Sequence, residues 1–276
     1  MDPARRRLLV GGGLFGALCV GGLAPTACAL RNLQRGRGVT ATAPPRRPPG
    51  QARPLLDEDI APVLARLDRW YAAHLPAGQP YHFNPPASDT RIDAVERLVG
   101  FSLPHSYRQL YRWHDGEDDD RWGHFYGLPL LPLKRVASEW RGWNEVIKGF
   151  GGDRYKIPGA SFPAGAVDPA YANPRWIALT GDGSGNSIGL DFDPWPGGRV
   201  GQVILYGRDE DVKLVIADSL GRFLQWIAGL LESGNVRLDA APGEQLLRRF
   251  RLKNPPVDHF HDGLRTLLGA PGPFVR

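Results

Sequence analysis

Cysteine is almost absent from this chain of 276 residues. The sequence has two cysteines, Cys19 and Cys28, and both lie close to the N-terminus. The remainder of the chain therefore cannot form a disulfide, use a cysteine nucleophile or bind zinc through thiolates. An oxidising compartment would also place no redox demand on it.

A basic surface is missing from the part of the chain that is rich enough in hydrophobic residues to fold. The whole sequence carries a net charge of +5, but residues 1–54 hold nine arginines against one aspartate, a net of +8. Residues 55–239 hold 19 basic against 25 acidic residues, a net of −6, and residues 240–276 have a net of +3. Because binding to phosphates needs a basic face, the acidic region argues against a nucleic-acid partner.

Complete catalytic and cofactor-binding motifs are also missing. The stretch 181–186, Gly-Asp-Gly-Ser-Gly-Asn, is not followed by Gly-Lys-Ser/Thr and lacks the carboxylate spacing of an EF-hand. No His and Asp arrangement identifies a serine triad. We therefore predict no catalytic residue, no metal site and no cofactor, and we interpret 181–186 as a tight turn in which the glycines supply positive φ.

A metal-dependent envelope hydrolase is the competing interpretation. Asp191 and Asp193 alternate along a predicted strand end and so share one face, and Asp182 is the third candidate carboxylate. His259 and His261 would supply at most half of a metal site, and a solvated tail is the alternative there.

The N-terminus has the order of an export signal. Arg5, Arg6 and Arg7 precede an apolar run over residues 8–23, and small residues follow around residue 28. The pattern predicts a signal peptide over residues 1–29, with export by the twin-arginine or the Sec route. A membrane anchor is the alternative, although the run is shorter than the ~20 residues of a spanning helix. Cys28 could carry a lipid, so the predicted location is periplasmic or membrane-tethered in the envelope.

The remaining chain divides into three predicted regions. Residues 30–54 are rich in proline and arginine and predict a disordered linker. Residues 55–239 predict one folded domain. Residues 240–276 predict a C-terminal extension with a short helix at residues 244–251.

Apolar spacing gives a coarse secondary structure for the domain. Helical periodicity predicts helices at residues 60–71, 91–99 and 133–147, a helix capped by Ser102 that stops at Gly116, and another from Asp218 or Ser219 to Gly234. Strands are predicted at residues 124–131, 176–180, 187–192, 200–206 and 212–217. Helices grouped before and after a run of strands indicate the α+β class rather than a doubly wound sheet.

Several ordered motifs between residues 91 and 234 resemble the SMI1/KNR4 family of the SUKH superfamily. The positions that match are Leu103, Pro104, Tyr107, Tyr111, Gly116, Gly181, Gly185, Asn186, Asp191, Pro194, Gly201, Gln202, Val203 and Ser219. The resemblance implies a single α+β domain with a curved, mainly antiparallel sheet flanked by helices, and a protein-binding function without catalysis. Bacterial members resemble immunity proteins that neutralise toxins, and fungal relatives regulate cell-wall synthesis. The main prediction is therefore binding of a toxin in the envelope, and a cell-wall assembly regulator or scaffold is the alternative.

An acidic run bordered by aromatic residues predicts the partner-binding surface, because such mixtures suit protein interfaces. The predicted residues are Asp115, Glu117, Asp118, Asp119, Asp120, Trp122 and Tyr126, with Asp182 and Asn186 of the turn as neighbours. The net charge of −6 would steer a basic protein partner toward them, with Trp122 contributing most affinity. A hydrated loop with core aromatics is the alternative.

Overall fold

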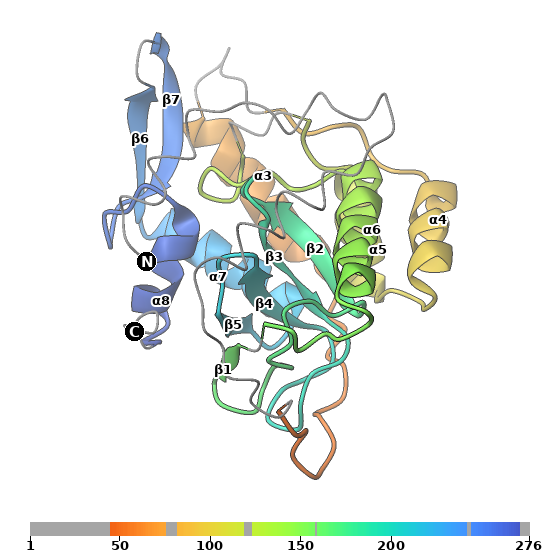
Figure 1. Cartoon of the computed structure of the whole chain (residues 1–276). Helices are drawn as coiled ribbons and strands as arrows, with labels where there is room; N and C mark the ends of the chain where they lie inside the picture. The colour runs from red at the N-terminus through yellow and green to blue at the C-terminus, as the bar shows by residue number, and fades with distance from the viewer. Residues whose placement is uncertain (1–44, 76–81, 119–122, 158, 242–243, 271–276) are drawn as a thin grey trace, which may run out of the picture. The chain divides into compact units, whose positions relative to one another are not determined.

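The computed structural model describes residues 45–75, 82–118, 123–157, 159–241 and 244–270 (Figure 1). Its helices and strands, in chain order, are α3 (Ala61–His74), α4 (Asp89–Val99), α5 (His105–Trp113), α6 (Leu133–Gly149), β1 (Ala160–Phe162), β2 (Trp176–Gly181), β3 (Asn186–Asp191), β4 (Gln202–Gly207), β5 (Val212–Ala217), α7 (Leu220–Glu232), β6 (Val236–Ala241), β7 (Glu244–Leu252) and α8 (Phe260–Leu267). Within these ranges no helix combines the length and apolar character needed to cross a membrane.

A five-stranded sheet in the order β1-β5-β4-β3-β2 forms the centre of the fold. The pairs β2–β3, β3–β4 and β4–β5 are antiparallel. At one edge, β1 pairs with β5 in parallel, and the sequence analysis missed this strand because it has only three residues. The predicted α+β fold with a mainly antiparallel sheet is confirmed.

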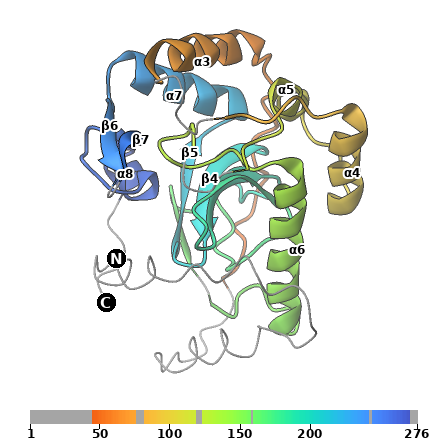
Figure 2. The ribbon, with the colours of Figure 1, turned by 90° about the horizontal axis from the view of Figure 1, so that it is seen from above.

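Helices cover the sheet in two groups. The helix α7 packs against β4 and β5, and α3 packs on α7, as the view in Figure 2 shows. The helix α6 packs against β2, and α4 packs on α6. The spacing of buried residues on α7 explains its position, because its apolar stripe faces the sheet: Leu220, Phe223, Leu224, Ile227 and Leu231.

Three consecutive acidic residues ahead of α3 hold the N-terminal ends of three helices. The Asp57 carboxylate accepts hydrogen bonds from His105 N at 2.7 Å and Ser106 N at 2.9 Å, and so caps α5. Glu58 accepts a hydrogen bond from Ser219, whose own hydroxyl oxygen caps α7. The Asp59 carboxylate accepts from Ala61 N at 3.0 Å. Negative charge at helix N-termini is stabilising, so this short segment ties α3, α5 and α7 together.

The prediction that Ser102 caps the helix α5 is wrong. The residue at the N-cap of α5 is Pro104, and no side chain adjacent in sequence caps this helix. The helix α7 does begin as predicted, because the Ser219 side chain accepts a hydrogen bond from Arg222 N.

The strand predicted at residues 124–131 is also wrong. Tyr126 and Gly127 have φ values of 54° and 89°, which interrupt an extended backbone. Only isolated bridges remain, Phe125 with Leu128 and Leu130 with Thr180. The apolar residues of this segment are nevertheless buried, which explains why their pattern looked like a strand.

The C-terminal extension differs most from the prediction. Residues 244–251 belong to the strand β7, which pairs with β6 in an antiparallel hairpin. The residues at 259–262 are not a solvated tail, because α8 begins at Phe260, and Phe260 and His261 are both 2% exposed. Register places Val236 opposite Leu252 and Leu238 opposite Phe250, so an apolar face forms only when the two strands pair.

Part of the predicted linker lies against the domain. Arg47 forms an ion pair with Asp193 at 2.9 Å, and Arg53 forms one with Asp218 at 2.9 Å. The backbones of Arg53 and Arg199 also form an isolated parallel β-bridge. Residues 45–54 thus contact the domain that was expected to begin at Leu55, while residues 1–44, with the predicted signal peptide and Cys28, lie outside the described residues.

We expect Phe250→Ala to lower the free energy of unfolding by about 3–5 kcal/mol. Phe250 is 0% exposed and stacks on Tyr126 with ring centroids 4.9 Å apart, so truncation would leave a cavity in the domain core. Denaturant unfolding would measure this change, with the exposed Lys253→Ala at the end of the same hairpin as the control. Equal stability of the two variants would show that the extension is not part of the core.

Candidate functional site

The acidic bend at Asp115, Gly116 and Glu117 is held by internal contacts. Asp115 is 2% exposed, its Oδ1 accepts a hydrogen bond from Leu133 N at 2.8 Å, and its carboxylate pairs with Arg91. Gly116 has φ of 68°, and a Cβ there would lie 2.3 Å from Pro132 N. The bend therefore requires glycine at this position and closes against the start of α6.

Glu117 acts as a buried acceptor for the loop that follows. Its side chain is 1% exposed, and it accepts hydrogen bonds from Leu130 N at 2.8 Å and more weakly from His124 N. Its Oε2 lies 2.9 Å from His124 Nδ1. Phe83 stacks on the His124 ring with centroids 3.8 Å apart. One carboxylate thus holds together two points of the chain that frame residues 118–123.

These contacts place Asp115 and Glu117 in the interior, whereas the sequence predicted them to be part of an exposed partner-binding surface. Asp115 and Glu117 are buried because their carboxylates replace backbone partners that the bend lacks, and only Asp118 of the described acidic run is exposed, with 59% of its side chain in solvent. Asp119, Asp120 and Trp122 lie outside the described residues. Their predicted partner-binding role stays a prediction.

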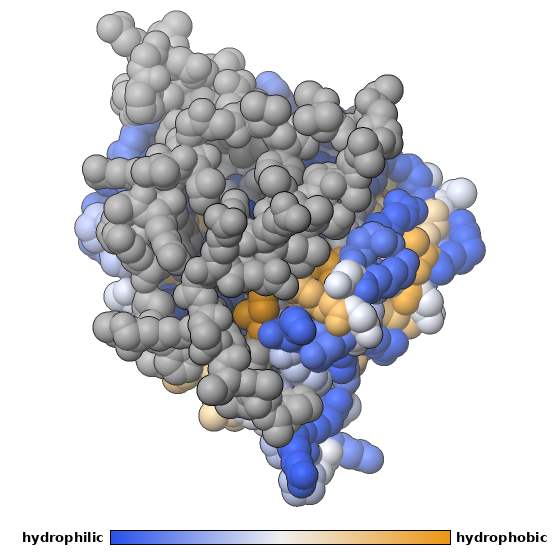
Figure 3. Space-filling model, viewed as in Figure 1, coloured by the Kyte–Doolittle hydropathy of each residue, from blue (hydrophilic) through white to orange (hydrophobic). Residues whose placement is uncertain are grey.

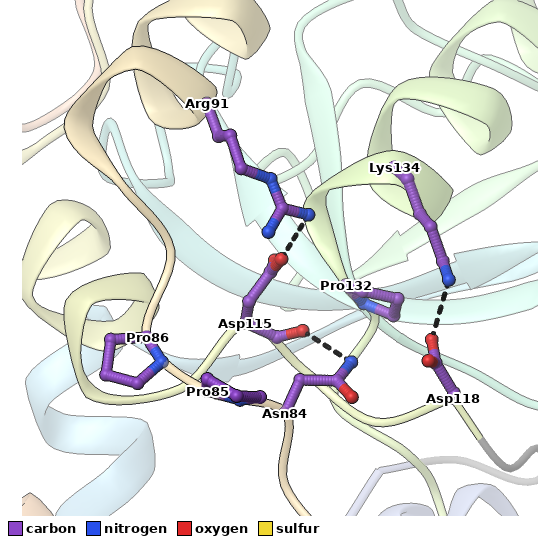
Figure 4. A pocket seen from close by; sticks show the side chains of 8 residues that line it. All are labelled: Asn84, Pro85, Pro86, Arg91, Asp115, Asp118, Pro132 and Lys134. Carbon is purple, nitrogen blue, oxygen red and sulfur yellow. Dashed lines mark hydrogen bonds and ion pairs between the residues drawn. The ribbon is translucent and has the colours of Figure 1, made fainter.

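A pocket lies beside this bend and encloses about 280 Å³ (Figure 4). Four separate segments line it, with Asn84, Pro85, Pro86, Arg91, Asp115, Asp118, Pro132 and Lys134. Figure 4 shows Arg91 pointing to Asp115 from α4 and Lys134 pointing to Asp118 from α6. The Lys134 Nζ is 2.9 Å from the Asp118 carboxylate, and this hydrogen bond lowers the pKa of Asp118. The pocket therefore holds two opposite charge pairs next to the exposed end of the bend.

The sequence analysis missed Arg91 and Lys134 as residues of the site. A usable signal was present, because both lie in the first turn of a helix, α4 and α6, where the helix dipole disfavours a cation. A cation in the first turn of a helix implies that a carboxylate lies nearby. The sequence does not show which carboxylate this is, since Asp115 is 24 positions from Arg91.

Tyr126, the predicted aromatic neighbour, is covered by the C-terminal extension of the same chain. It is 3% exposed, and its ring stacks on Phe250 at 4.9 Å and on Phe260 at 4.8 Å. Its hydroxyl group donates to Asn235 O at 3.2 Å. Tyr126 is therefore a core residue of this chain, and the expectation of a surface position is wrong.

The turn at Asp182 and Asn186 is a structural turn. The Asp182 carboxylate accepts hydrogen bonds from Ser184 N at 2.7 Å, Asn186 N at 3.0 Å and Asn186 Nδ2 at 2.7 Å. Asn186 is 1% exposed, and its Oδ1 accepts from Asp209 N at 2.9 Å. These contacts join the β2–β3 turn to the β4–β5 turn. They leave the Asn186 side chain with internal partners.

The structure does not bring Asp182 to the other two carboxylates proposed for a hydrolase, Asp191 and Asp193. Asp182 lies at the β2–β3 turn and Asp191 at the opposite end of β3, about 17 Å away at the rise of a strand. Asp191 is 0% exposed and accepts from Trp176 Nε1 at 3.1 Å, Gln202 Nε2 at 3.0 Å and Asp193 N at 2.9 Å. Among the described residues, no group of three potential ligands is placed to hold a metal ion.

The described surface offers little apolar area for binding. Grey atoms cover much of the face in Figure 3, and beside them hydrophilic residues surround a smaller group of hydrophobic ones. Within the described ranges, Leu55 is the large apolar side chain that is exposed, at 41%.

We expect Glu117→Ala to lower the free energy of unfolding by at least about 2 kcal/mol, because it leaves Leu130 N and His124 without their buried acceptor. The matched variant Asp118→Ala, one residue away and exposed, should change stability by less than about 0.5 kcal/mol. Urea unfolding of both variants would measure the difference. A Glu117→Ala protein as stable as Asp118→Ala would contradict the role of Glu117 as a buried support.

We expect Asp191 to make stability depend on pH below neutrality. Burial raises the pKa of Asp191 from its usual 3.8 to about 7, against the opposing effect of its hydrogen-bond donors. As pH rises, the unfolded chain therefore loses this proton at a lower pH than the folded chain does. The free energy of unfolding falls between about pH 4 and pH 7, by roughly 4 kcal/mol in total. Above pH 7 this contribution is constant.

Denaturant unfolding at several pH values would test this dependence in the natural protein and in Asp191→Asn, with Asp118→Asn as the control. The decline between pH 4 and 7 should be smaller in Asp191→Asn alone. Parallel curves for all three proteins would show that Asp191 titrates as in the unfolded chain.

Comparison with curated proteins finds fungal regulators. The chain is 30% identical to "Cell wall assembly regulator SMI1" of Saccharomyces cerevisiae over 72% of this chain and 47% of that protein. It is 36% identical to "Cell wall biosynthesis/cell cycle regulator smi1" of Schizosaccharomyces pombe, over 54% of this chain and 31% of that protein. It is 27% identical to "Glucan synthesis regulatory protein" of Neurospora crassa, over 73% and 44%. The chain thus spans less than half the length of each of these relatives.

These relatives overturn the predicted location. The sequence analysis predicted an exported protein, periplasmic or tethered to the membrane of the envelope. The proteins it is similar to are regulators of cell-wall assembly, of glucan synthesis and of the cell cycle. Arg5 to Arg7 and the apolar run had the order of a signal, but a short pattern of this kind carries less information than similarity over most of the chain.

The family profile matches the part of the chain that contains the bend, the pocket and the sheet. The profile of the SMI1 / KNR4 family (SUKH-1) matches residues 86–226, slightly more than half of the chain. This region runs from Pro86 at the pocket to Trp226 within α7. The ordered motifs and the α+β fold agree with this match, and the chain belongs to the SMI1/KNR4 family.

Proposed function

We propose that this chain is a non-enzymatic, protein-binding regulator that acts in cell-wall assembly. The observation that carries the proposal is the construction of the bend. Asp115 and Glu117 are buried and fixed by their contacts. The next residue in the chain, Asp118, is exposed and lines the pocket. A rigid base that presents a short polar segment is a common way to build a protein-binding surface.

The names of the relatives favour regulation over toxin immunity. The three relatives are named for cell-wall assembly, cell-wall biosynthesis or glucan synthesis. The immunity interpretation depended on the resemblance to bacterial members, and the relatives found give it no support. We therefore place the protein partner in cell-wall assembly, and the acting unit includes the C-terminal extension because Phe250 and Phe260 complete its core.

The partner surface that we propose consists of residues 118–122, of which the structure describes Asp118, with 59% of its side chain exposed. Glu117 and Tyr126 are excluded from direct contact because both are buried. The side chains of Asp182 and Asn186 have hydrogen-bond partners within the β2–β3 and β4–β5 turns, so we do not include them. The net charge of −6 over residues 55–239 favours a basic partner, mainly through a faster association.

Affinity capture with the full chain tests this function. The natural protein and the variants Trp122→Ala, Asp118→Asn and Lys148→Gln would each be used to capture proteins from an extract of the source cells. A partner held by this surface should be captured by the natural chain and by Lys148→Gln, which lies at the far end of α6.

Binding of that partner should weaken by about 2 kcal/mol or more in Trp122→Ala, if this aromatic contributes as interface tryptophans often do. Asp118→Asn should slow association and reduce its dependence on salt. A partner that binds all variants with equal rates would place the interface elsewhere. Turnover of a cell-wall substrate by the purified chain would refute the non-enzymatic proposal.

A further inference from the structure

The pocket beside the bend has charges of both signs, and they differ in mobility. Asp115 is fixed: its side chain is 3% exposed, its Oδ1 is held by Leu133 N, and its backbone donates to Pro85 O and accepts from Asn84 Nδ2. Lys134 and Arg91 are long side chains that are 64% and 49% exposed. The fixed charge of the pocket is therefore negative, and its two cations can move into solvent, while the second carboxylate, Asp118, is 59% exposed and accessible to a new cation.

The walls of the pocket also suit a cation better than an anion. Pro85, Pro86 and Pro132 have no backbone N–H, so three of the lining residues cannot donate a hydrogen bond to an anion from their main chain. Their rings offer apolar surface instead. A lysine or arginine side chain needs this combination, an apolar wall for its methylene groups and a carboxylate for its head group.

The size of the pocket limits the ligand to a small group. At about 280 Å³ it is slightly smaller than the roughly 300–1,000 Å³ of sites for drug-sized ligands. A single side chain of a protein partner fits this limit.

We propose that this pocket takes a lysine or arginine side chain of the partner, which replaces Lys134 beside Asp118 and lies over the three prolines. This inference deepens the proposed function and rests on it, since it assumes a protein ligand at this surface. Lys134 is then an internal competitor that occupies the cation position when the partner is absent. The exchange costs little, because one exposed ion pair replaces another.

The test uses Lys134→Gln, for which this inference predicts an increase in affinity. The probe is a capped hexa-arginine peptide, and its dissociation constant is measured at low and constant ionic strength with the full chain. Removing the competitor should tighten binding by about two- to five-fold, the range that exposed ion pairs support. A capped hexa-glutamate peptide serves as the probe of opposite charge.

The matched control is Lys148→Gln. Lys148 is on the same helix, is 72% exposed and pairs with Glu145 at 2.6 Å, so its loss changes the net charge equally. Asp118→Asn should weaken binding of hexa-arginine relative to the natural chain. The inference requires tighter binding in Lys134→Gln than in Lys148→Gln, together with weaker binding in Asp118→Asn.

Two results would overturn the inference. Equal affinities of Lys134→Gln and Lys148→Gln would show that only net charge matters. Binding of hexa-glutamate that is lost in Lys134→Gln would show that the pocket takes an anion. If capture finds a partner that depends on Trp122 while the peptide test fails, the pocket inference is wrong and the proposed function stands. If the peptide exchange occurs but no captured partner depends on residues 118–122, the proposed function is the part that fails.

Discussion

The carboxylate of Glu117 is the interaction on which the site depends. A buried carboxylate is costly unless hydrogen-bond donors surround it, and Leu130 N and His124 supply those donors. Because these donors come from positions seven and 13 residues further along the chain, the carboxylate fixes both ends of a loop. Asp115, two residues before Glu117, has a related role, because its carboxylate accepts a hydrogen bond from Leu133 N at the start of α6. Glu117 and His124, on either side of residues 118–123, are therefore held by contacts that solvent does not reach.

The helices α3 to α7 and the four longer strands of the main sheet could be predicted, because their apolar residues repeat at the period of a helix or a strand. Prediction failed where a distant partner decides the conformation. Residues 244–251 have a helical pattern, yet they form β7 because β6 pairs with them. Residues 124–131 look like a strand, yet Tyr126 adopts positive φ because its ring packs between Phe250 and Phe260. The mixed run at 115–120 appeared hydrated, because sequence alone does not show which carboxylate meets a backbone donor.

Counting charges also gave an incomplete picture of the surface. Asp115, Glu117, Asp168, Asp191 and Glu210 are acidic residues that lie buried, and several of them have internal cationic partners. Their contribution to the field seen by a partner is smaller than the net charge of the region suggests. The charge that this surface presents therefore depends more on the local arrangement of fixed and mobile charges than on the total.

The position of Phe250, Phe260 and Leu264 in the core has a consequence for synthesis of the protein. The family profile ends at residue 226, but these three residues are fully or almost fully buried against the helices and the bend region. As the chain leaves the ribosome from its N-terminus, Trp70 and Tyr126 emerge long before the aromatic rings that cover them. The nascent domain must therefore expose an apolar face until its last strand and helix arrive, and that interval is when a chaperone would be needed most.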